Sequence, residues 1–346
     1  MGQSLANKYR PQSFSEVVSQ STTVAIVRKL CERDQLSNRN FLFTGPAGCG
    51  KTTISRIIAH TLNGNYENII EVDAASHSSV DNIRELIQEA SQYPIGSKYK
   101  IIILDEAHSL SNQAFQALLK SLENQVGNTV WILATTNPEK IPDTIISRVL
   151  PFKLSKISAE NIQQRLKFIL DSEIAEGRKI TYTDDALSYL ARLSNGGMRD
   201  AITSLDKVLA FGTDITTELL EKALDLPSYE DYFSLLNSLV RKDNTGITSM
   251  VDRVYNSGTN FVKWFEGFHS FLCNIVKYVL LKDISRTMIP THYQDKISKY
   301  NEQHVFICLK LANVVLTMNK ELKTTQYLQE TAMTYLCTPI PVKKEG

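Results

Sequence analysis

A glycine-rich stretch, GPAGCGKT at residues 45–52, constrains this chain more than any other feature of its sequence. It fits the pattern G-x-x-x-x-G-K-[ST], in which glycines let backbone N–H groups turn toward a phosphate. An apolar run at residues 41–44 precedes it and a helical pattern at residues 54–62 follows it. This order predicts a phosphate-binding loop between a strand and a helix. Lys51 is expected to neutralise β- and γ-phosphate charge, and Thr52 to bind Mg²⁺.

Apolar runs continue to alternate with helical patterns up to about residue 155. Strands are predicted at residues 69–72, 100–104 and 130–134, and helices at residues 81–90 and 114–122. This alternation predicts a parallel, doubly wound α/β sheet. We assign Ile83 and Leu86, which share a helical face, to core packing.

Polar side chains follow two of the predicted buried strands. Asp105 and Glu106 end the run at residues 100–104, where Asp105 is placed to hold Mg²⁺ and Glu106 to polarise an attacking water. Thr136 and Asn137 close the next strand, which we expect between the other two strands and beside the γ-phosphate. A plain turn at Asn137 is the alternative interpretation.

The pattern becomes helical after residue 155. Ser158 is a suitable N-cap for a helix that Gly177 would end, and further helices are predicted from residue 183 or 184 to about 195 and over residues 200–211. The first helix is expected to bury one apolar face, which consists of Ile162, Leu166, Ile169 and Ile174.

Helical patterning also fills the C-terminal part of the chain. Aromatic residues recur there at spacings of three and four, a pattern more typical of a core or an oligomer interface than of a base-stacking surface. They are Phe261, Trp264, Phe265, Phe268 and Phe271. We predict three domains, over residues 1–155, 156–225 and 226–346.

Two arginines are candidates for reading the terminal phosphate. Ser147 and Arg148 are expected to follow the sheet, where a cation could reach the nucleotide of a neighbouring subunit. Arg199 comes just after Gly196 and Gly197 at the start of a predicted helix and could swing over the γ-phosphate. The alternative for both is a solvated surface charge.

Composition limits the other possibilities. The 38 Lys and Arg residues against 37 Asp and Glu give a net charge of +1, which disfavours a protein that coats DNA non-specifically. The five cysteines are scattered and form no C-x-x-C pair, which indicates an intracellular chain without a zinc ribbon. No signal peptide or membrane-spanning run is evident, so we expect a cytoplasmic location.

An ordered series of motifs resembles the bacterial DNA polymerase III clamp-loader gamma/tau subunits, which are AAA+ ATPases. The likeness extends from Lys8 to about Gly212 and includes KYRP at residues 8–11 and FSEVVSQ at residues 14–20. It continues with EVDAAS at 71–76, LDEAHSL at 104–110, ALLKSLE at 117–123, LATTNP at 133–138, IISR at 145–148 and GMRDA at 197–201.

The resemblance implies a fold and a set of site residues. The fold is an AAA+ P-loop core with a parallel sheet, an all-α lid and an all-α collar. Thr136 would be sensor 1, Arg199 sensor 2 and Arg148 a finger acting on a neighbour. The nucleotide site would comprise Tyr9, Arg10, Pro11, Val17 and Val18 at the adenosine end, with Gly45, Ala47, Gly48, Cys49, Gly50, Lys51, Thr52, Thr53, Asn137 and Arg199. Implied DNA contacts are His77, Ser78, Ser79, Asn112 and Gln113.

The chain departs from the family pattern in four places. Residues 63–68 bridge directly to the next strand where the family inserts a four-cysteine module, so we expect no zinc. Val149 replaces the cysteine of the Ser-Arg-Cys motif. His77 and the serines after it stand where basic residues are common, and the chain ends at residue 346 without a long tau-like tail.

The implied activity is ATP hydrolysis that drives the loading of a sliding clamp, with ATP and Mg²⁺ as ligands. Implied partners are the clamp, delta- and delta-prime-type subunits, copies of the chain itself and primer–template DNA, with no membrane. A non-hydrolysing delta-prime-like subunit and another AAA+ DNA remodeller are the alternatives. The compact, zinc-free form could come from a phage or plasmid, in which case the location is the host cytoplasm.

Overall fold

The computed structural model describes residues 3–32, 40–64, 68–124 and 128–338. The chain forms two compact units, one of residues 1–180 with 190–206 and the other of residues 181–189 with 207–346. Two of the helices, α8 (Asp184–Leu193) and α9 (Met198–Phe211), contribute residues to both units. None of the described helices is long and apolar enough to cross a membrane.

The first unit is built on a five-stranded parallel sheet with the order β2-β3-β4-β1-β5. The strands are β1 (Phe41–Thr44), β2 (Ile69–Asp73), β3 (Lys100–Asp105), β4 (Thr129–Thr135) and β5 (Leu150–Lys153). All of β4 is buried, and it lies between β1 and β3 as the sequence predicted. The edge strand β5 was not predicted. Arg148 therefore precedes the last strand, and the expectation that it follows the sheet was wrong.

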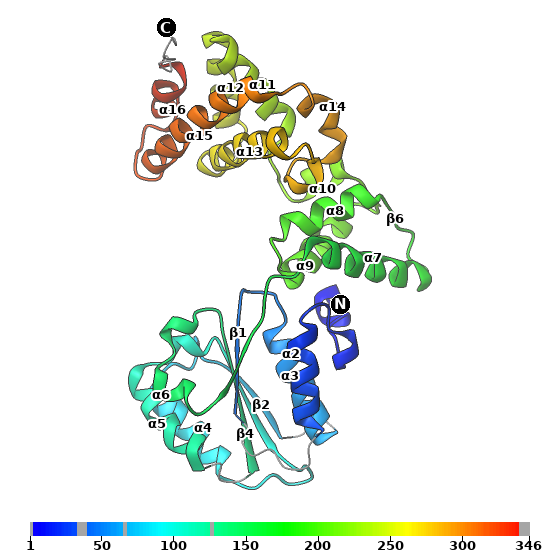
Figure 1. Ribbon diagram of the computed structural model, residues 1–346, viewed down its shortest axis with the longest axis vertical. Helices are drawn as coiled ribbons and strands as arrows, with labels where there is room; N and C mark the ends of the chain where they lie inside the picture. The colour runs from blue at the N-terminus through cyan, green and yellow to red at the C-terminus, as the bar shows by residue number, and fades with distance from the viewer. Residues whose placement is uncertain (1–2, 33–39, 65–67, 125–127, 339–346) are drawn as a thin grey trace. The chain divides into compact units, whose positions relative to one another are not determined.

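Helices cover both faces of this sheet (Figure 1). On one face lie α2 (Ser21–Cys31) and α3 (Lys51–Asn63); on the other lie α4 (Val80–Ala90), α5 (Asn112–Asn124) and α6 (Asp143–Ile146). Alternate residues of each strand enter opposite cores, so Ile103 packs with α3 while Leu104 packs with α4 and α5. Ile83 and Leu86 belong to the second core, which confirms their assignment.

Helix α7 (Ala159–Ala175) begins where the sequence predicted. The Ser158 hydroxyl caps it by accepting a hydrogen bond from the Asn161 N–H at 3.2 Å. Ile162 and Ile169 are fully buried, but Ile174 is 38% exposed, so its assignment to the buried face was wrong. Successive spacings of four, three and four residues from Ile162 lead to position 173 on the buried face, and this position is occupied by Glu173. Ile174 lies one residue further around the helix and faces water.

The N-terminal segment of the first unit contains α1 (Leu5–Lys8) and the 3₁₀ turn η1 (Phe14–Glu16). It packs on α7 and α9, because the Leu5 N–H donates to Asp206 Oδ2 at 2.9 Å and Asn161 Nδ2 donates to Ser19 Oγ at 2.7 Å. Short 3₁₀ turns also follow β3, at η2 (Ala107–Ser109), and β4, at η4 (Pro138–Lys140).

The second unit is mostly helical. Its helices are α10 (Thr217–Ala223), α11 (Tyr229–Arg241), α12 (Asn244–Asn256), α13 (Phe261–Leu281), α14 (Gln294–Ile297), α15 (Glu302–Leu322) and α16 (Leu328–Cys337), with 3₁₀ turns η5 (Ile284–Arg286) and η6 (Thr291–Tyr293). A two-stranded parallel pair, β6 (Thr181–Tyr182) with β7 (Asp214–Ile215), accompanies them. The aromatic residues of α13 that the sequence singled out are all buried, so they form core. The predicted boundaries at residues 155 and 225 stay a prediction.

Candidate active site

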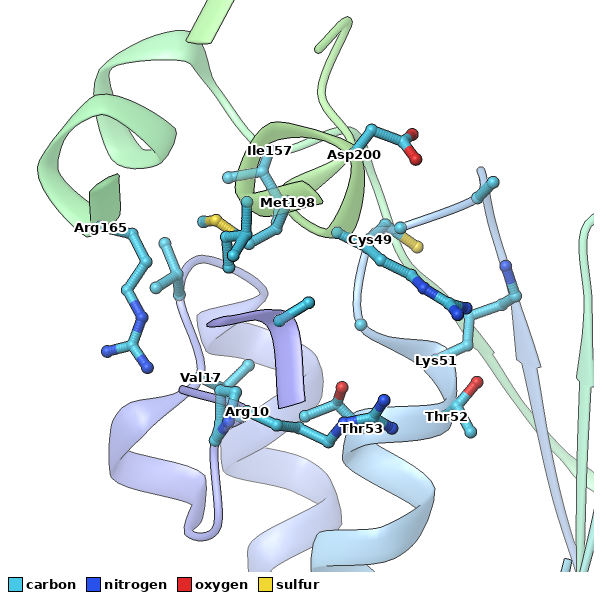
Figure 2. Close-up of a pocket in the computed structure, with 18 of the residues that line it drawn as sticks. Arg10, Val17, Cys49, Lys51, Thr52, Thr53, Ile157, Arg165, Met198 and Asp200 are labelled. Carbon is cyan, nitrogen blue, oxygen red and sulfur yellow. The ribbon is translucent and has the colours of Figure 1, made fainter. Parts of the chain in front are cut away.

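A pocket of about 330 Å³ lies within the first unit, at the carboxyl ends of the central strands (Figure 2). The N-terminal segment, the glycine-rich loop, the end of β3, α7 and α9 all contribute to it. Its lining residues are Ala6, Tyr9, Arg10, Pro11, Val17, Val18, Ala47, Gly48, Cys49, Gly50, Lys51, Thr52, Thr53, Asp105, Glu106, Ile157, Arg165, Met198, Arg199, Asp200 and Ile202. The structure thus brings together most of the site residues predicted from the sequence.

The glycine-rich loop adopts a backbone that side chains would block. Gly45 has φ +149°, and a Cβ there would lie 2.5 Å from the Leu154 carbonyl oxygen. Gly50, at φ +108°, sits at the N-cap of α3 and leaves the N–H groups of the first turn facing the pocket. Lys51, 6% exposed, donates from Nζ to the Gly45 and Pro46 carbonyls, both at 2.9 Å. This geometry, a glycine-rich loop that leads into a helix N-terminus, suits the binding of an anion.

The end of β3 supplies oxygen atoms to the same pocket. Thr52 Oγ1 donates to Asp105 Oδ2 at 2.6 Å, and Asp105 Oδ1 accepts from the Glu106 N–H at 3.0 Å. Among the described residues no group of three or more His, Cys, Asp or Glu side chains gathers as a metal site. One hydroxyl and one carboxylate nevertheless fit Mg²⁺, which takes oxygen ligands, needs few from the protein and completes its shell with phosphate and water.

Glu106 is held beside Asp105 by residues that follow β3 and β4. Its backbone is left-handed, with φ +47°, which turns the chain sharply after the strand. Glu106 Oε2 accepts from Thr136 Oγ1 at 3.0 Å and lies 3.2 Å from His108 Nδ1. His108 Nδ1 also lies 3.0 Å from Oγ1 of Thr135, which is fully buried. Thr136 therefore contacts Glu106 but does not line the pocket.

His108 and Thr135 support the Glu106 carboxylate from outside the pocket, and the sequence did not single them out as candidate site residues. The sequence contained a weak signal, since Thr135 adjoins Thr136 and His108 lies two residues after Glu106, but nothing in it indicated that His108 and Thr135 meet. Asn137 also lies outside the pocket lining, and its N–H donates to Thr135 Oγ1 at 3.1 Å. Gly45 does not line the pocket either, although it shapes the loop.

Helix α9 closes the pocket over the glycine-rich loop. The Met198 N–H donates to the Gly48 carbonyl at 3.0 Å, and a Cβ on Gly48 would approach Gly197 Cα to 3.0 Å. Gly48 and Gly197 thus let two backbones meet. This contact places Arg199, one residue into the helix, in the pocket lining.

Arg148 lies apart from this pocket, between α6 and β5. Its Nε donates to Glu123 Oε1 at 2.6 Å and its Nη1 donates to the Thr144 carbonyl at 2.7 Å. The side chain is 33% exposed. The structure therefore does not bring Arg148 to this pocket of its own chain.

A buried carboxylate anchors the N-terminal segment beside the pocket. Glu173, 3% exposed, accepts hydrogen bonds from Lys8 Nζ at 2.7 Å, Tyr9 OH at 2.8 Å and Arg178 Nη1 at 2.6 Å. Burial favours the neutral acid, but these hydrogen bonds outweigh it and lower the pKa of Glu173 to about 2. Arg165 Nη2 in turn donates to the Tyr9 carbonyl at 2.8 Å, which fixes the backbone that lines the pocket.

The predicted DNA contacts form a separate group. His77 and Ser79 are exposed in the turn before α4, and Asn112 and Gln113 are exposed in the first turn of α5. The two segments adjoin, because the N–H of Ser111 donates to the carbonyl of Ser78 at 3.4 Å. Ser79 also caps α4.

Family models match two stretches of the chain. Residues 62–158 match the model described as "DNA polymerase III, delta subunit". Residues 161–214 match the model described as "DNA polymerase III clamp loader subunit, ATPase lid domain".

Curated relatives match over most of the chain. The chain is 32% identical to DNA polymerase III subunit gamma of Buchnera aphidicola subsp. Baizongia pistaciae, over 87% of this chain and 88% of the relative. It is 31% identical to DNA polymerase III subunit gamma/tau of Mycoplasma genitalium, over 90% of this chain and 55% of the relative. For DNA polymerase III subunit tau of Escherichia coli the identity is 31%, over 76% and 43%. The chain thus spans about half the length of these gamma/tau and tau relatives.

Among solved structures, the chain is similar to the Thermotoga maritima RuvB Holliday junction branch migration motor. The TM-score is 0.53 at 19% identity, over 67% of this chain and 79% of that one. This likeness shows the fold alone.

Proposed function

The chain belongs to the DNA polymerase III gamma/tau family of clamp-loader ATPases, and we propose that it uses ATP to open a sliding clamp and place it on primer–template DNA. The observation that carries this proposal is the convergence on one pocket of the glycine-rich loop, the Thr52–Asp105 pair and Glu106. The fold and the ATPase class follow from the family. The roles of individual residues and the partners are our proposal.

Several residues in and beside the pocket have a proposed role in hydrolysis. The N–H groups of the loop and Lys51 Nζ bind the β- and γ-phosphates, while Thr52 and Asp105 hold Mg²⁺. When bound, the ion neutralises charge that develops on the phosphates. Glu106 orients and polarises the attacking water, and its hydrogen bond from Thr136 keeps the carboxylate aimed at the γ-phosphate.

The two arginines of one chain contact the γ-phosphates of two different subunits. Arg199 acts within its own subunit, because its helix is tied to the glycine-rich loop. Arg148 acts on the nucleotide of a neighbouring subunit, which is supported by its place outside its own pocket. ADP lacks the γ-phosphate, so both contacts distinguish the two nucleotide states and can drive a conformational switch.

Partners and domains follow from the same proposal. We assign residues 1–155 to the ATPase core, 156–225 to a lid and 226–346 to a collar that joins copies of this chain with delta- and delta-prime-type subunits. His77, Ser78, Ser79, Asn112 and Gln113 are proposed to meet primer–template DNA. We propose that the assembly works in the cytoplasm with the replication machinery.

Steady-state ATP hydrolysis tests this function. We would measure the complex of the protein and its co-purified partner subunits under three conditions: without DNA, with primed DNA, and with primed DNA plus the sliding clamp. Joint stimulation that disappears in Arg148→Ala is expected. Stimulation that survives Arg148→Ala would contradict the role of Arg148, and no stimulation at all would contradict clamp loading.

A non-hydrolysing structural role is the second candidate, because the matched model over residues 62–158 is that of a delta subunit. The intact set of Lys51, Thr52, Asp105 and Glu106 disfavours it. If wild type and Lys51→Ala bind ATP equally, the structural role is the better account.

A further inference from the structure

We propose that Arg10 binds the phosphate chain of the nucleotide in its own subunit, so that the N-terminal segment contacts both ends of ATP. The family resemblance placed this residue with the adenosine end. The inference rests on the proposed nucleotide function of the pocket. It adds a third arginine, supplied in cis, to Arg148 and Arg199.

The position of Arg10 in the pocket supports this assignment. Arg10 lines the same pocket as Lys51 and Asp105. Figure 2 shows its side chain extending from the N-terminal segment toward the first turn of α3, where Thr53 lies. Arg165, another arginine that lines the pocket, lies at the end of the pocket far from Lys51 (Figure 2). The two arginines therefore reach different parts of one bound nucleotide.

Two of the charges that act on Arg10, those of Arg199 and Asp105, belong to residues that line the pocket. Its guanidinium interacts electrostatically with Arg56, Arg199 and Asp105, and with Glu71 on β2. Burial, and next the charge of Arg56, lower the pKa of Arg10. A guanidinium that stays charged in a partly buried position near two other arginines is stabilised by a bound anion, and its planar donors suit a phosphate.

The nearby carboxylates already have partners. Glu71 accepts from Arg56 Nε at 2.6 Å and from Arg56 Nη2 at 2.7 Å. Asp105 accepts from the Thr52 hydroxyl. The guanidinium of Arg10 donates instead to the side-chain oxygen of Asn7 at 3.2 Å, an exposed and neutral contact that a phosphate can replace.

The segment that carries Arg10 is fixed on both sides. Tyr9 is held at its hydroxyl by Glu173 and at its carbonyl by Arg165. Pro11 follows directly and restricts the backbone of Arg10 itself. The guanidinium is therefore delivered from an anchored backbone, as a ligand that must reach one phosphate chain requires.

Equilibrium titrations with ATP, ADP and AMP test the proposal on the full chain in the presence of Mg²⁺. The variants are Arg10→Ala, Arg10→Lys and the control Arg84→Ala, which removes an exposed arginine of α4 that pairs with Asp81. Removing a charge-assisted hydrogen bond should weaken ATP and ADP binding by about 10- to 100-fold. AMP should change by much less, because it lacks the distal phosphates. Arg10→Lys should recover part of the lost affinity. The control Arg84→Ala should bind all three nucleotides as the wild type does.

The outcomes of these titrations either support or overturn the assignment of Arg10 to the phosphate chain. An equal loss for ATP, ADP and AMP would place Arg10 at the adenosine end and overturn the proposal, as would unchanged ATP affinity. If the melting temperature of nucleotide-free Arg10→Ala falls, Arg10→Lys provides the test, with a smaller loss that is still greater for ATP than for AMP. Failure of the wild type to bind ATP would instead remove the proposed function, so the two failures are distinguishable.

Discussion

The two units bury different kinds of side chain. In the first unit the buried polar residues include three with full charges, Lys51, Lys100 and Glu173. Those of the second unit, over its described residues, are neutral: Thr217, Asn274, Thr287 and Asn319. Burying a charged group costs free energy unless hydrogen-bond or ionic partners compensate it. Each buried charge therefore indicates a position where such partners are built into the structure.

The partners of the three charges support this reading. Lys51 donates to two carbonyls of the glycine-rich loop, and Lys100 Nζ donates to the Glu89 carbonyl at 2.7 Å. Glu173 has three donors. Lys51 lies in the pocket and Glu173 beside it, while Lys100 is the first residue of β3, at the opposite end of the strand from Asp105.

The second unit is held by aromatic packing instead. Tyr232 packs on Trp264 with ring centroids 4.8 Å apart, and its hydroxyl donates to the Trp264 carbonyl at 3.0 Å. Gly267 makes room for this contact, since a Cβ there would lie 2.0 Å from the Tyr232 hydroxyl oxygen. We infer that substitutions of the pocket residues in the first unit act mainly on nucleotide chemistry, and that substitutions in the aromatic core of the second unit act mainly on stability.

The largest expected effect concerns the chemistry. Glu106→Gln removes the proposed base while keeping an acceptor for the Thr136 hydroxyl, so ATP turnover should fall by roughly 100- to 10,000-fold with little change in ATP affinity. Single-turnover hydrolysis and ATP titration measure the two. Glu85→Gln, on the exposed face of α4, is the matched control. Turnover within about tenfold of wild type would contradict the role of Glu106.

The next effect concerns the aromatic core. Phe268→Ala should lower the free energy of unfolding of the second unit by about 3–5 kcal/mol, because the fully buried ring leaves a cavity. Leu280→Ala in the same helix should cost far less, since Leu280 is 66% exposed. Urea denaturation measures both. Similar costs for the two variants would show that α13 does not pack as described.

Glu173 should contribute a pH-dependent stability to the first unit. Its folded pKa, about 2, lies below the ordinary 4.5, so its contribution is complete above pH 4.5 and is lost as pH falls toward 2. Glu173→Gln should therefore destabilise most at neutral pH, and its difference from wild type should narrow as the pH falls below 4.5. Denaturation midpoints from pH 7 to pH 3 give this difference. A constant difference would show that hydrogen bonding without charge accounts for the anchor.

The smallest effect is expected at Ile174. Because it faces water, Ile174→Ser should change the free energy of unfolding by no more than about 0.5 kcal/mol. The buried Ile169, in the same helix, provides the contrast: Ile169→Ala should cost about 2–5 kcal/mol. Thermal or urea unfolding of the pair measures the difference, and a large cost at Ile174 would mean that α7 is rotated relative to this account.

The sequence predicts the part of the fold that rests on local pattern. The buried strands β1, β3 and β4 are continuous apolar runs, and the glycine-rich loop has a spacing that its chemistry requires. Strand β5 is different, because it is a four-residue edge strand containing Pro151 and has too few residues to show a period. Its pairing with β1 is set by the fold around it.

The candidate site divides in the same way. Lys51, Thr52, Asp105 and Glu106 follow from motifs at the ends of predicted strands. Glu173 could not be predicted, because a glutamate in an amphipathic helix normally faces water and its donors Lys8 and Tyr9 lie more than 160 positions away along the chain. The placement of Arg10 toward the phosphates likewise depends on tertiary contacts that no local pattern encodes.

Calorimetric titration of ATP into wild type and Lys51→Ala, with and without Mg²⁺, tests the central claim most directly. The account predicts that the wild type binds ATP, that Mg²⁺ changes this binding through Thr52 and Asp105, and that Lys51→Ala weakens it by at least about 100-fold, since a buried lysine contributes charge and hydrogen bonds to the phosphates. Equal affinity in wild type and Lys51→Ala would contradict the claim that this pocket holds the nucleotide.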